Sequence, residues 1–225
     1  MNNIDYNIRQ ETKNDYREVE NLAREAFWNL SYPGCNEHYF IHIMRDHPDF
    51  IRELAYVAEA DGRIVGCVMY CKARLADGNG NEKNIVTMGP LCVLPGYQRK
   101  GCGKALLEHT FRIARSMGYE VVVNFGNPDN YVARGYKSSL KYNVCFEGDF
   151  FPAALLVKEL KEGALDGRRW YYYPSDVDKP CDDEEALARF DSQFPAKVKA
   201  WQPSQEEFFI HSHSVMNCPD KDEMT

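Results

Sequence analysis

The stretch from Gly96 to Leu107, GYQRKGCGKALL, places glycines and cations directly before an apolar helical pattern. The first turn of a helix has unpaired backbone N–H groups and carries the positive end of the helix dipole. Glycines let the backbone approach a ligand closely, and Arg99, Lys100 and Lys104 add positive charge. These residue types in this order predict a binding site for a phosphate group.

Two common phosphate-binding motifs fail on a residue that their chemistry requires. A P-loop needs a lysine and then a serine or threonine after its second glycine. Gly96 and Gly101 have the P-loop spacing, but Cys102 stands at the lysine position and no hydroxyl residue follows. A dinucleotide fingerprint needs three glycines; Gly101 and Gly103 are present, but Leu106 occupies the third position.

The segment LCVLPGYQRKGCGKALL resembles motif A of the GNAT superfamily of acetyl-CoA-dependent N-acetyltransferases. That motif reads Q/R-x-x-G-x-G/A after a strand that ends in V-x-P, and here it runs from Gln98 to Gly103 after Val93 and Pro95. The resemblance implies that backbone N–H groups of the loop hold the pyrophosphate of coenzyme A. It also implies that the backbone of Cys92 and Val93 pairs with the pantetheine amides.

The segment NFGNPDNYVARGYK resembles a second part of the same family, in which a strand-end asparagine precedes the pattern Y-x-x-x-G-F/Y. Asn124 and Tyr131 have the family's separation, and Gly135 and Tyr136 complete the pattern. The resemblance implies that Tyr131 is the general acid that protonates the departing thiolate. The cofactor-binding residues that it implies are Cys92, Val93, Gln98, Arg99, Lys100, Gly101, Cys102, Gly103, Lys104, Ala105 and Asn124.

The resemblance covers residues 4 to 160 and is closest to a bacterial subgroup of predicted N-acetyltransferases with unassigned substrate. It implies an α/β (α+β) fold, the GNAT fold, with a mixed central sheet of splayed strands flanked by helices. The pattern of the chain agrees with this order, with a hairpin around Asp61-Gly62 and a strand from Ile85 that contains Gly89-Pro90. Proline cannot donate to a strand ladder, so we expect the strand to bulge or splay there.

The general base of the reaction is not assigned by the sequence. Glu37 and His38 lie in CNEHYF, a segment that the resemblance places on the acceptor side. Histidine has a suitable pKa for deprotonating an ammonium group, and Glu53 or Glu59 remain alternatives.

The composition changes after Lys161, where aromatic residues, prolines and acids alternate around one short helical stretch at 183–190. We therefore expect two parts: an acetyltransferase domain at 1–160, and an extension at 161–225 that packs on this domain or forms a dimer contact. The extension is too weakly patterned to build a second core.

The net charge of −7 argues against a nucleic-acid partner, and no apolar run is long enough to span a membrane. The eight cysteines include no CxxC pair, and the N-terminal residues lack an apolar signal segment. We therefore expect reduced thiols and a cytoplasmic location. His211 and His213 have no further ligands at zinc spacing, so we expect no metal.

The predicted function is transfer of an acetyl group from acetyl-CoA, as co-substrate, to a primary amine of a small molecule or peptide. The amine attacks the thioester directly, without a covalent enzyme intermediate. The alternative is a coenzyme A-binding sensor or structural module that keeps the fold but has no turnover. A homodimer is compatible with either prediction.

Overall fold

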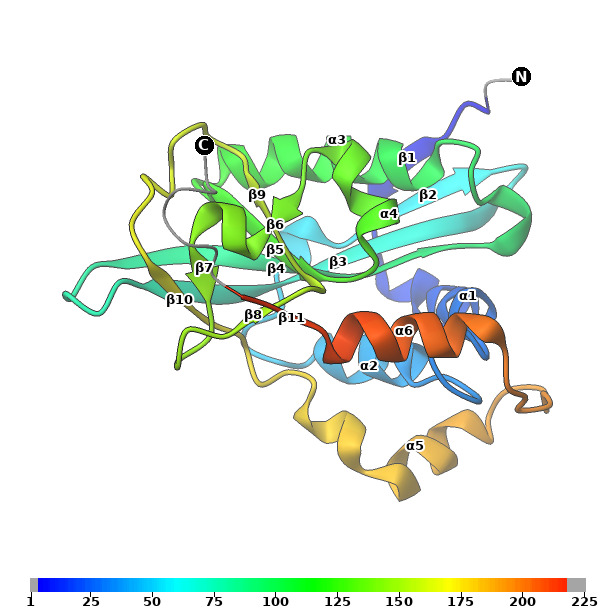
Figure 1. The fold of residues 1–225 in the computed structure, drawn as a ribbon. Helices are drawn as coiled ribbons and strands as arrows, with labels where there is room; N and C mark the ends of the chain where they lie inside the picture. Colours follow the sequence, from blue (N-terminus) through cyan, green and yellow to red (C-terminus); the bar gives the residue numbers. More distant parts are fainter. Residues whose placement is uncertain (1–3, 218–225) are drawn as a thin grey trace. The chain divides into compact units, whose positions relative to one another are not determined.

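The computed structural model describes residues 4–217 of the 225-residue chain, which form two compact units (Figure 1). Each unit is described by itself. Within the described residues, the first unit consists of 4–71, Gly89–Ile113 and Ser175–Glu206, and the second consists of Lys72–Met88, Ala114–Pro174 and 207–217.

Six α-helices and six short 3-10 helices occur in the described residues. The α-helices are α1 (Tyr16–Phe27), α2 (Glu37–Met44), α3 (Cys102–Ser116), α4 (Pro128–Tyr131), α5 (Glu184–Asp191) and α6 (Pro203–His213). The 3-10 helices are η1 (Lys13–Asp15), η2 (Arg52–Leu54), η3 (Pro95–Tyr97), η4 (Val132–Arg134), η5 (Ser139–Tyr142) and η6 (Lys179–Asp182).

Most of the strands in the described residues belong to one mixed sheet. The longer strands are β1 (Asn7–Gln10), β2 (Tyr56–Ala60), β3 (Arg63–Ala76), β4 (Glu82–Val93), β5 (Val121–Phe125), β9 (Leu155–Glu159) and β10 (Trp170–Tyr173). The two-residue strands are β6 (Lys137–Ser138), β7 (Val144–Cys145), β8 (Phe151–Pro152) and β11 (Val215–Met216).

The first unit contains the antiparallel strands β1, β2 and β3. Asp61 and Gly62 join β2 to β3 with positive φ angles of 51° and 75°, and Ala60 pairs with Arg63 across the turn. Two central residues with positive φ give a turn whose twist matches that of the paired strands. The hairpin predicted around Asp61-Gly62 is therefore confirmed.

The core of the first unit lies between this part of the sheet and helices α1 and α2, which lie side by side in Figure 1. Val19, Leu22 and Ala23 follow helical spacing on α1 and are at most 2% exposed. Ile41 and Met44 of α2 join the same apolar cluster. This face of the sheet is thus covered by the segment that contains Glu37 and His38.

The second unit contains the parallel pair β4–β5, with Val86 opposite Val122 and Thr87 opposite Val123. Strand β9 pairs antiparallel with β5 and β6. Together with the antiparallel strands of the first unit, this confirms the predicted mixed sheet flanked by helices. The Gly89–Pro90 peptide is cis, and the splaying of the strand at this position stays a prediction.

Residues after 160 contribute to both units. In the second unit, β10 pairs with β3 and with β7. In the first unit, the segment from Ser175 to Glu206 contacts α1 and the loop after it: Arg24 pairs with Asp191 at 2.7 Å, and Trp28 Nε1 donates to the Val198 carbonyl at 2.9 Å. We call residues 175–206 the arm.

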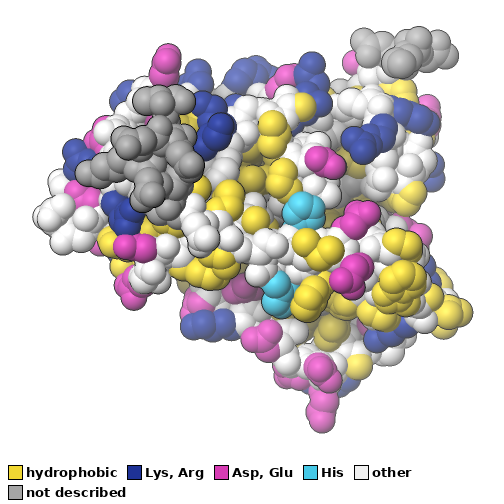
Figure 2. Space-filling model, in the orientation of Figure 1, with side chains coloured by type: hydrophobic (Ala, Val, Ile, Leu, Met, Phe, Trp, Pro, Cys, Tyr) yellow, Lys and Arg dark blue, Asp and Glu magenta, His cyan; other side chains and the backbone are white. Residues whose placement is uncertain are grey.

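The sequence predicted one helix in the extension, and this was wrong. Besides α5, which confirms the predicted stretch, the structure has α6, which begins at Pro203. Proline is favoured in the first turn of a helix because its missing N–H would be unpaired there. Phe208, Phe209 and Ile210 of α6 are each about half exposed, and Figure 2 shows hydrophobic side chains gathered on this helix.

Seven of the eight cysteines lie in the described residues, all as free thiols, and six of them are buried. Cys218 lies outside the described residues. None of the helices formed by residues 4–217 is long and apolar enough to cross a membrane.

Candidate functional site

The loop between β4 and α3 has the backbone conformation of an anion-binding helix start. Arg99 and Gly101 have positive φ angles of 60° and 93°. The Ala105 N–H donates to the Gly101 carbonyl at 3.0 Å, so the regular bonding of α3 begins at Gly101. The N–H groups of Cys102, Gly103 and Lys104 precede this bond and have no partner within the helix.

Ala105 stays a predicted cofactor-binding residue, and its N–H forms the first bond of the helix. The candidate backbone donors of the loop are therefore those of residues 102–104.

The cations of the loop are exposed. Lys100 Nζ donates to the Gly96 carbonyl at 2.6 Å, and Lys104 Nζ lies 3.7 Å from the Glu108 carboxylate. Within the described part of the chain, no carboxylate pairs with Arg99 or Lys100. Two positive charges therefore remain uncompensated beside the helix start, where they oppose the helix dipole unless an anion binds.

The end of β4 lies against the same helix start. A Cβ atom at Gly103 would lie 3.7 Å from Leu91 Cδ2 and 3.8 Å from Val93 Cγ2, which is ordinary contact. Gln98 Nε2 donates to the Val93 carbonyl at 3.1 Å. The structure thus brings the predicted residues from Cys92 to Lys104 together in the first unit.

Cys102 is buried by the packing of α3 on β3. A Cβ atom at Gly66 would lie only 2.6 Å from Cys102 Sγ and 3.1 Å from Leu106 Cδ1. Burial raises the pKa of the Cys102 thiol to about 12, so this thiol is not an activated nucleophile. Gly66 was missed in the sequence, although a glycine inside a strand pattern is a known sign of close backbone approach.

Asn124 and Tyr131 meet around Gly126 in the second unit. A Cβ atom at Gly126 would lie 2.6 Å from Tyr131 Cε2 and 3.3 Å from Asn124 Nδ2. Tyr131 is half-buried and packs edge-on against Tyr136, with ring centroids 5.6 Å apart. Asn124 is 1% exposed, and neither of its side-chain polar atoms has a hydrogen-bond partner among the described residues.

An unpartnered buried amide costs about 1–3 kcal/mol, so such groups are found where a ligand or water completes the bonding. Asn124 is therefore a binding-site candidate on structural grounds as well as by its sequence motif. Gly126 was not among the predicted residues; it provides the space that the Tyr131 ring occupies.

The His38 side chain has a structural role. It is fully buried, its Nε2 lies 3.0 Å from Asp191 Oδ1, and its ring packs against Phe190 and Phe194. Burial lowers the pKa of His38 to about 4, against the opposing effect of the Asp191 charge. The neutral ring holds the arm against α2.

Glu37 is the first residue of α2 and is half-buried. Its Oε2 accepts the Asn36 N–H at 3.2 Å. Burial raises the pKa of the Glu37 carboxyl to about 7. A carboxyl group with this pKa can exchange a proton near neutral pH.

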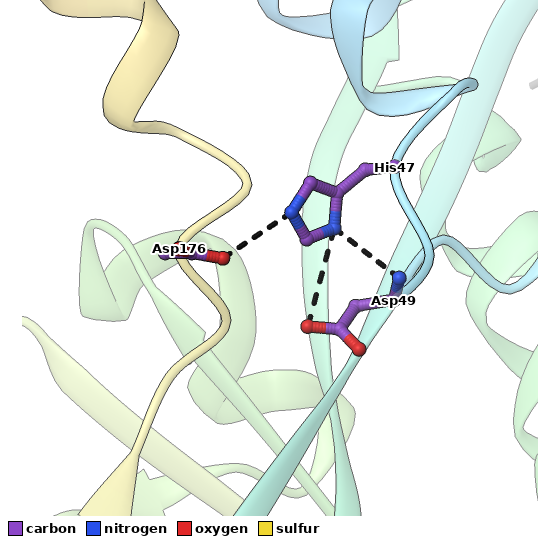
Figure 3. Close-up of side chains that lie close together, drawn as sticks. All are labelled: His47, Asp49 and Asp176. Atoms are coloured by element: carbon purple, nitrogen blue, oxygen red, sulfur yellow. Dashed lines mark hydrogen bonds and ion pairs between the residues drawn. The ribbon is translucent and has the colours of Figure 1, made fainter.

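His47, Asp49 and Asp176 form a cluster with metal-ligand chemistry, drawn in Figure 3. His47 Nδ1 accepts the Asp49 N–H at 3.2 Å, and His47 Nε2 lies 3.2 Å from Asp176 Oδ1. Because Nδ1 accepts a hydrogen bond, the neutral imidazole carries its proton on Nε2, and this N–H points to Asp176. We assign the cluster as a link between the loop after α2 and the start of the arm.

Two surface hollows of the first unit differ in their relation to the loop. One, about 410 Å³, is lined by Asp5, Asp61 and Glu59, an alternative general base, and contains none of the predicted cofactor-binding residues. The other, about 380 Å³, is lined by Glu18 of α1 and by 94–97, the first part of the loop between β4 and α3.

Comparisons with known proteins identify the family to which the chain belongs. Residues 15–137 match the acetyltransferase (GNAT) family model, which covers more than half of the chain. The chain therefore belongs to the GNAT acetyltransferase family, and the predicted family and enzyme class, an acyltransferase, are confirmed.

Among curated proteins, the chain is 26% identical over 144 residues to the uncharacterized N-acetyltransferase YhbS of Escherichia coli K12, covering 64% of this chain and 83% of the relative. Among solved structures, the fold is similar to that of Escherichia coli YhbS in complex with CoA, with a TM-score of 0.65 and 23% identity. The match covers 78% of this chain and 93% of the YhbS chain. It is also similar to that of a Brucella melitensis GNAT acetyltransferase in complex with acetyl-CoA, with a TM-score of 0.59 and 21% identity. This match covers 77% of this chain and 97% of the Brucella melitensis chain.

Proposed function

We propose that this protein transfers the acetyl group of acetyl-CoA to a primary amine of a small molecule or peptide. The observation that carries the proposal is the start of α3, where three unpaired N–H groups and two uncompensated cations lie beside the end of β4. The crystallised relatives bound to CoA and to acetyl-CoA support the choice of cofactor.

The pyrophosphate of the cofactor would accept hydrogen bonds from the N–H groups of Cys102, Gly103 and Lys104. Arg99 and Lys100 would neutralise its charge. The pantetheine amides would pair with the backbone of Cys92 and Val93, as the family resemblance implies. Because Gln98 donates to the Val93 carbonyl, this side chain would hold the strand end in position for the cofactor.

Asn124 would complete its hydrogen bonds on the pantetheine or acetyl group of the cofactor. Tyr131 would donate its phenolic proton to the thiolate of CoA. A phenol with an ordinary pKa near 10 can protonate a thiolate whose conjugate acid has a pKa of about 8–9. The acceptor amine would attack the thioester directly, without a covalent enzyme intermediate.

The oligomeric state and the location remain predictions. The seven described cysteines are thiols, which suits the reducing cytoplasm that we propose as the place of action. A homodimer remains compatible with the extension at 161–225.

Release of CoA thiol from acetyl-CoA over a panel of primary amines tests this function. We expect turnover with at least one amine, and a decrease in kcat of about 100-fold in Tyr131→Phe, the low end of the effect of a general acid. Acetyl-CoA affinity should remain, because the phenyl ring keeps the packing on Gly126. Tight acetyl-CoA binding without turnover on any amine would instead support the sensor alternative.

A further inference from the structure

Glu37 differs from four other buried or half-buried carboxylates of the first unit. Within the described residues, neither a lysine nor an arginine lies at ion-pair distance from it, and its carboxylate accepts hydrogen bonds from backbone N–H groups, that of Asn36 at 3.2 Å and its own. Four carboxylates of the unit contact an arginine instead: Glu11 with Arg45 (2.7 Å), Glu20 with Arg45 (2.8 Å), Asp15 with Arg9 (2.7 Å) and Asp191 with Arg24 (2.7 Å).

The groups that face Glu37 are weak acids. Its charge adds to burial in raising the pKa of the Tyr32 phenol and of the thiols of Cys35, Cys92 and Cys181. These groups come from the loop before α2, from β4 and from η6. All four are neutral at pH 7, so none of them compensates a carboxylate charge.

Glu37 lies near enough to β4 for its charge to contribute to the raised pKa of the Cys92 thiol, and Cys92 belongs to the part of β4 that we propose for the pantetheine. Cys92 precedes Val93 on β4 and packs in the same cluster as Leu22 of α1 and Ile41 of α2. Its side chain therefore points to the face of the sheet that these helices cover. Glu37 is the first residue of α2, one of these two helices.

We propose that Glu37 is the general base that deprotonates the acceptor amine, an inference that rests on the proposed acetyl transfer. The acceptor arrives as an ammonium ion, and the Glu37 carboxylate takes one proton from it. The neutral amine nitrogen then forms a bond to the thioester carbon, and the C–S bond breaks. The sulfur gains the phenolic proton of Tyr131, the second proton of the nitrogen passes through water to the Tyr131 phenolate, and Glu37 releases its proton to water.

His38 does not share this role. Its Nε2 faces Asp191 and its Nδ1 lies 3.5 Å from Cys35 Sγ, so both ring nitrogens face groups of the fold. Of the two neighbouring residues, Glu37 is thus the proposed base on the acceptor side, and His38 has a structural role.

Steady-state kinetics of Glu37→Gln across pH tests the proposal. For the wild type, kcat/KM should fall on the acid side with an apparent pKa near 7, because the carboxylate must be unprotonated to accept the proton. Glu37→Gln should lose about 100-fold or more in kcat at pH 8 and should lack this acid limb. Glu37→Asp should keep the limb at a reduced rate.

Glu184→Gln is the matched control, because Glu184 is also the first residue of a helix in the same unit but is exposed. Its kinetics should equal those of the wild type. CoA affinity, measured by calorimetry, and melting temperature show whether Glu37→Gln is folded and binds the cofactor. If this variant is folded and keeps kcat/KM within threefold with the same acid limb, the inference is wrong. If the wild type acetylates no amine, the proposed function itself fails.

Discussion

At the scale of single residues, the ionisable side chains in buried surroundings are of two kinds, those with a partner of opposite charge and those without one. Arg24 is 1% exposed and is held by Asp191, by the Pro195 carbonyl at 3.0 Å and by the Trp28 ring. Glu37 has no such cation partner within the described residues. We assign structural roles to the first kind of group and a chemical role to the second.

The ion pair of Arg24 gives a prediction about stability. Asp191→Asn should lower the free energy of unfolding by about 3 kcal/mol at pH 7, because it leaves a buried arginine without its counter-ion. Burial alone would raise the pKa of Asp191, but the hydrogen bond and charge of Arg24 lower it overall. The stabilisation is therefore present above the unfolded pKa of about 3.9 and is lost as the pH falls through the lower folded pKa.

Urea unfolding at pH 7 and pH 3 would measure this effect, with the difference between Asp191→Asn and the wild type shrinking at pH 3. Glu185→Gln is the control, since the Glu185–Arg189 pair is exposed and should contribute less than about 0.5 kcal/mol. Equal stabilities of Asp191→Asn and the wild type at pH 7 would mean that the arm does not hold Arg24.

At the scale of elements, the position of α3 depends on a glycine in the neighbouring strand. Gly66 pairs with Ala58 in the hairpin, and the absence of its side chain makes room for Cys102. The helix start, and with it the proposed pyrophosphate contacts, is therefore positioned by a residue 36 places earlier in the chain.

A double-mutant cycle tests this packing. Gly66→Ala should cost about 1–3 kcal/mol of stability, because its Cβ would overlap Cys102 Sγ. Cys102→Ala should restore part of the loss when combined with it, since it removes the sulfur; Leu106 Cδ1 and the Cys92 carbonyl remain close. Thermal unfolding of the four proteins measures the coupling, and strictly additive effects would refute the contact.

The sequence predicted the elements whose cause is local. The hairpin follows from Asp61-Gly62, and α1 follows from the spacing of its apolar residues. The start of α6 at Pro203 and a close approach at Gly66 have local signs in the sequence. The partner of Gly66 and the engagement of His38 by Asp191 depend on residues far apart in the chain, so no local pattern indicates them. For the same reason the sequence did not separate Glu37 from His38, which the packing of the arm distinguishes.

At the scale of the whole molecule, the proposed cofactor site depends on backbone geometry, and the proposed acceptor side depends on side chains. The motif of glycines and cations could be assigned from the sequence because it depends on one strand, one loop and one helix start. The proposed acceptor side, with Glu37, depends on α2 and on the arm that packs against it. The proposal for the loop is therefore the part of the account on which the other proposals depend.

Titration calorimetry of CoA with the wild type and with Gly101→Val is the most direct test of that proposal. Valine is strained at the φ of 93° that Gly101 adopts, so the variant should lose at least tenfold in affinity, or about 1.4 kcal/mol. Gly163→Val imposes the same kind of strain at a φ of 74°, at an exposed position in the second unit, and should bind CoA like the wild type. The absence of binding heat with the wild type, or an unchanged affinity in Gly101→Val, would contradict the account.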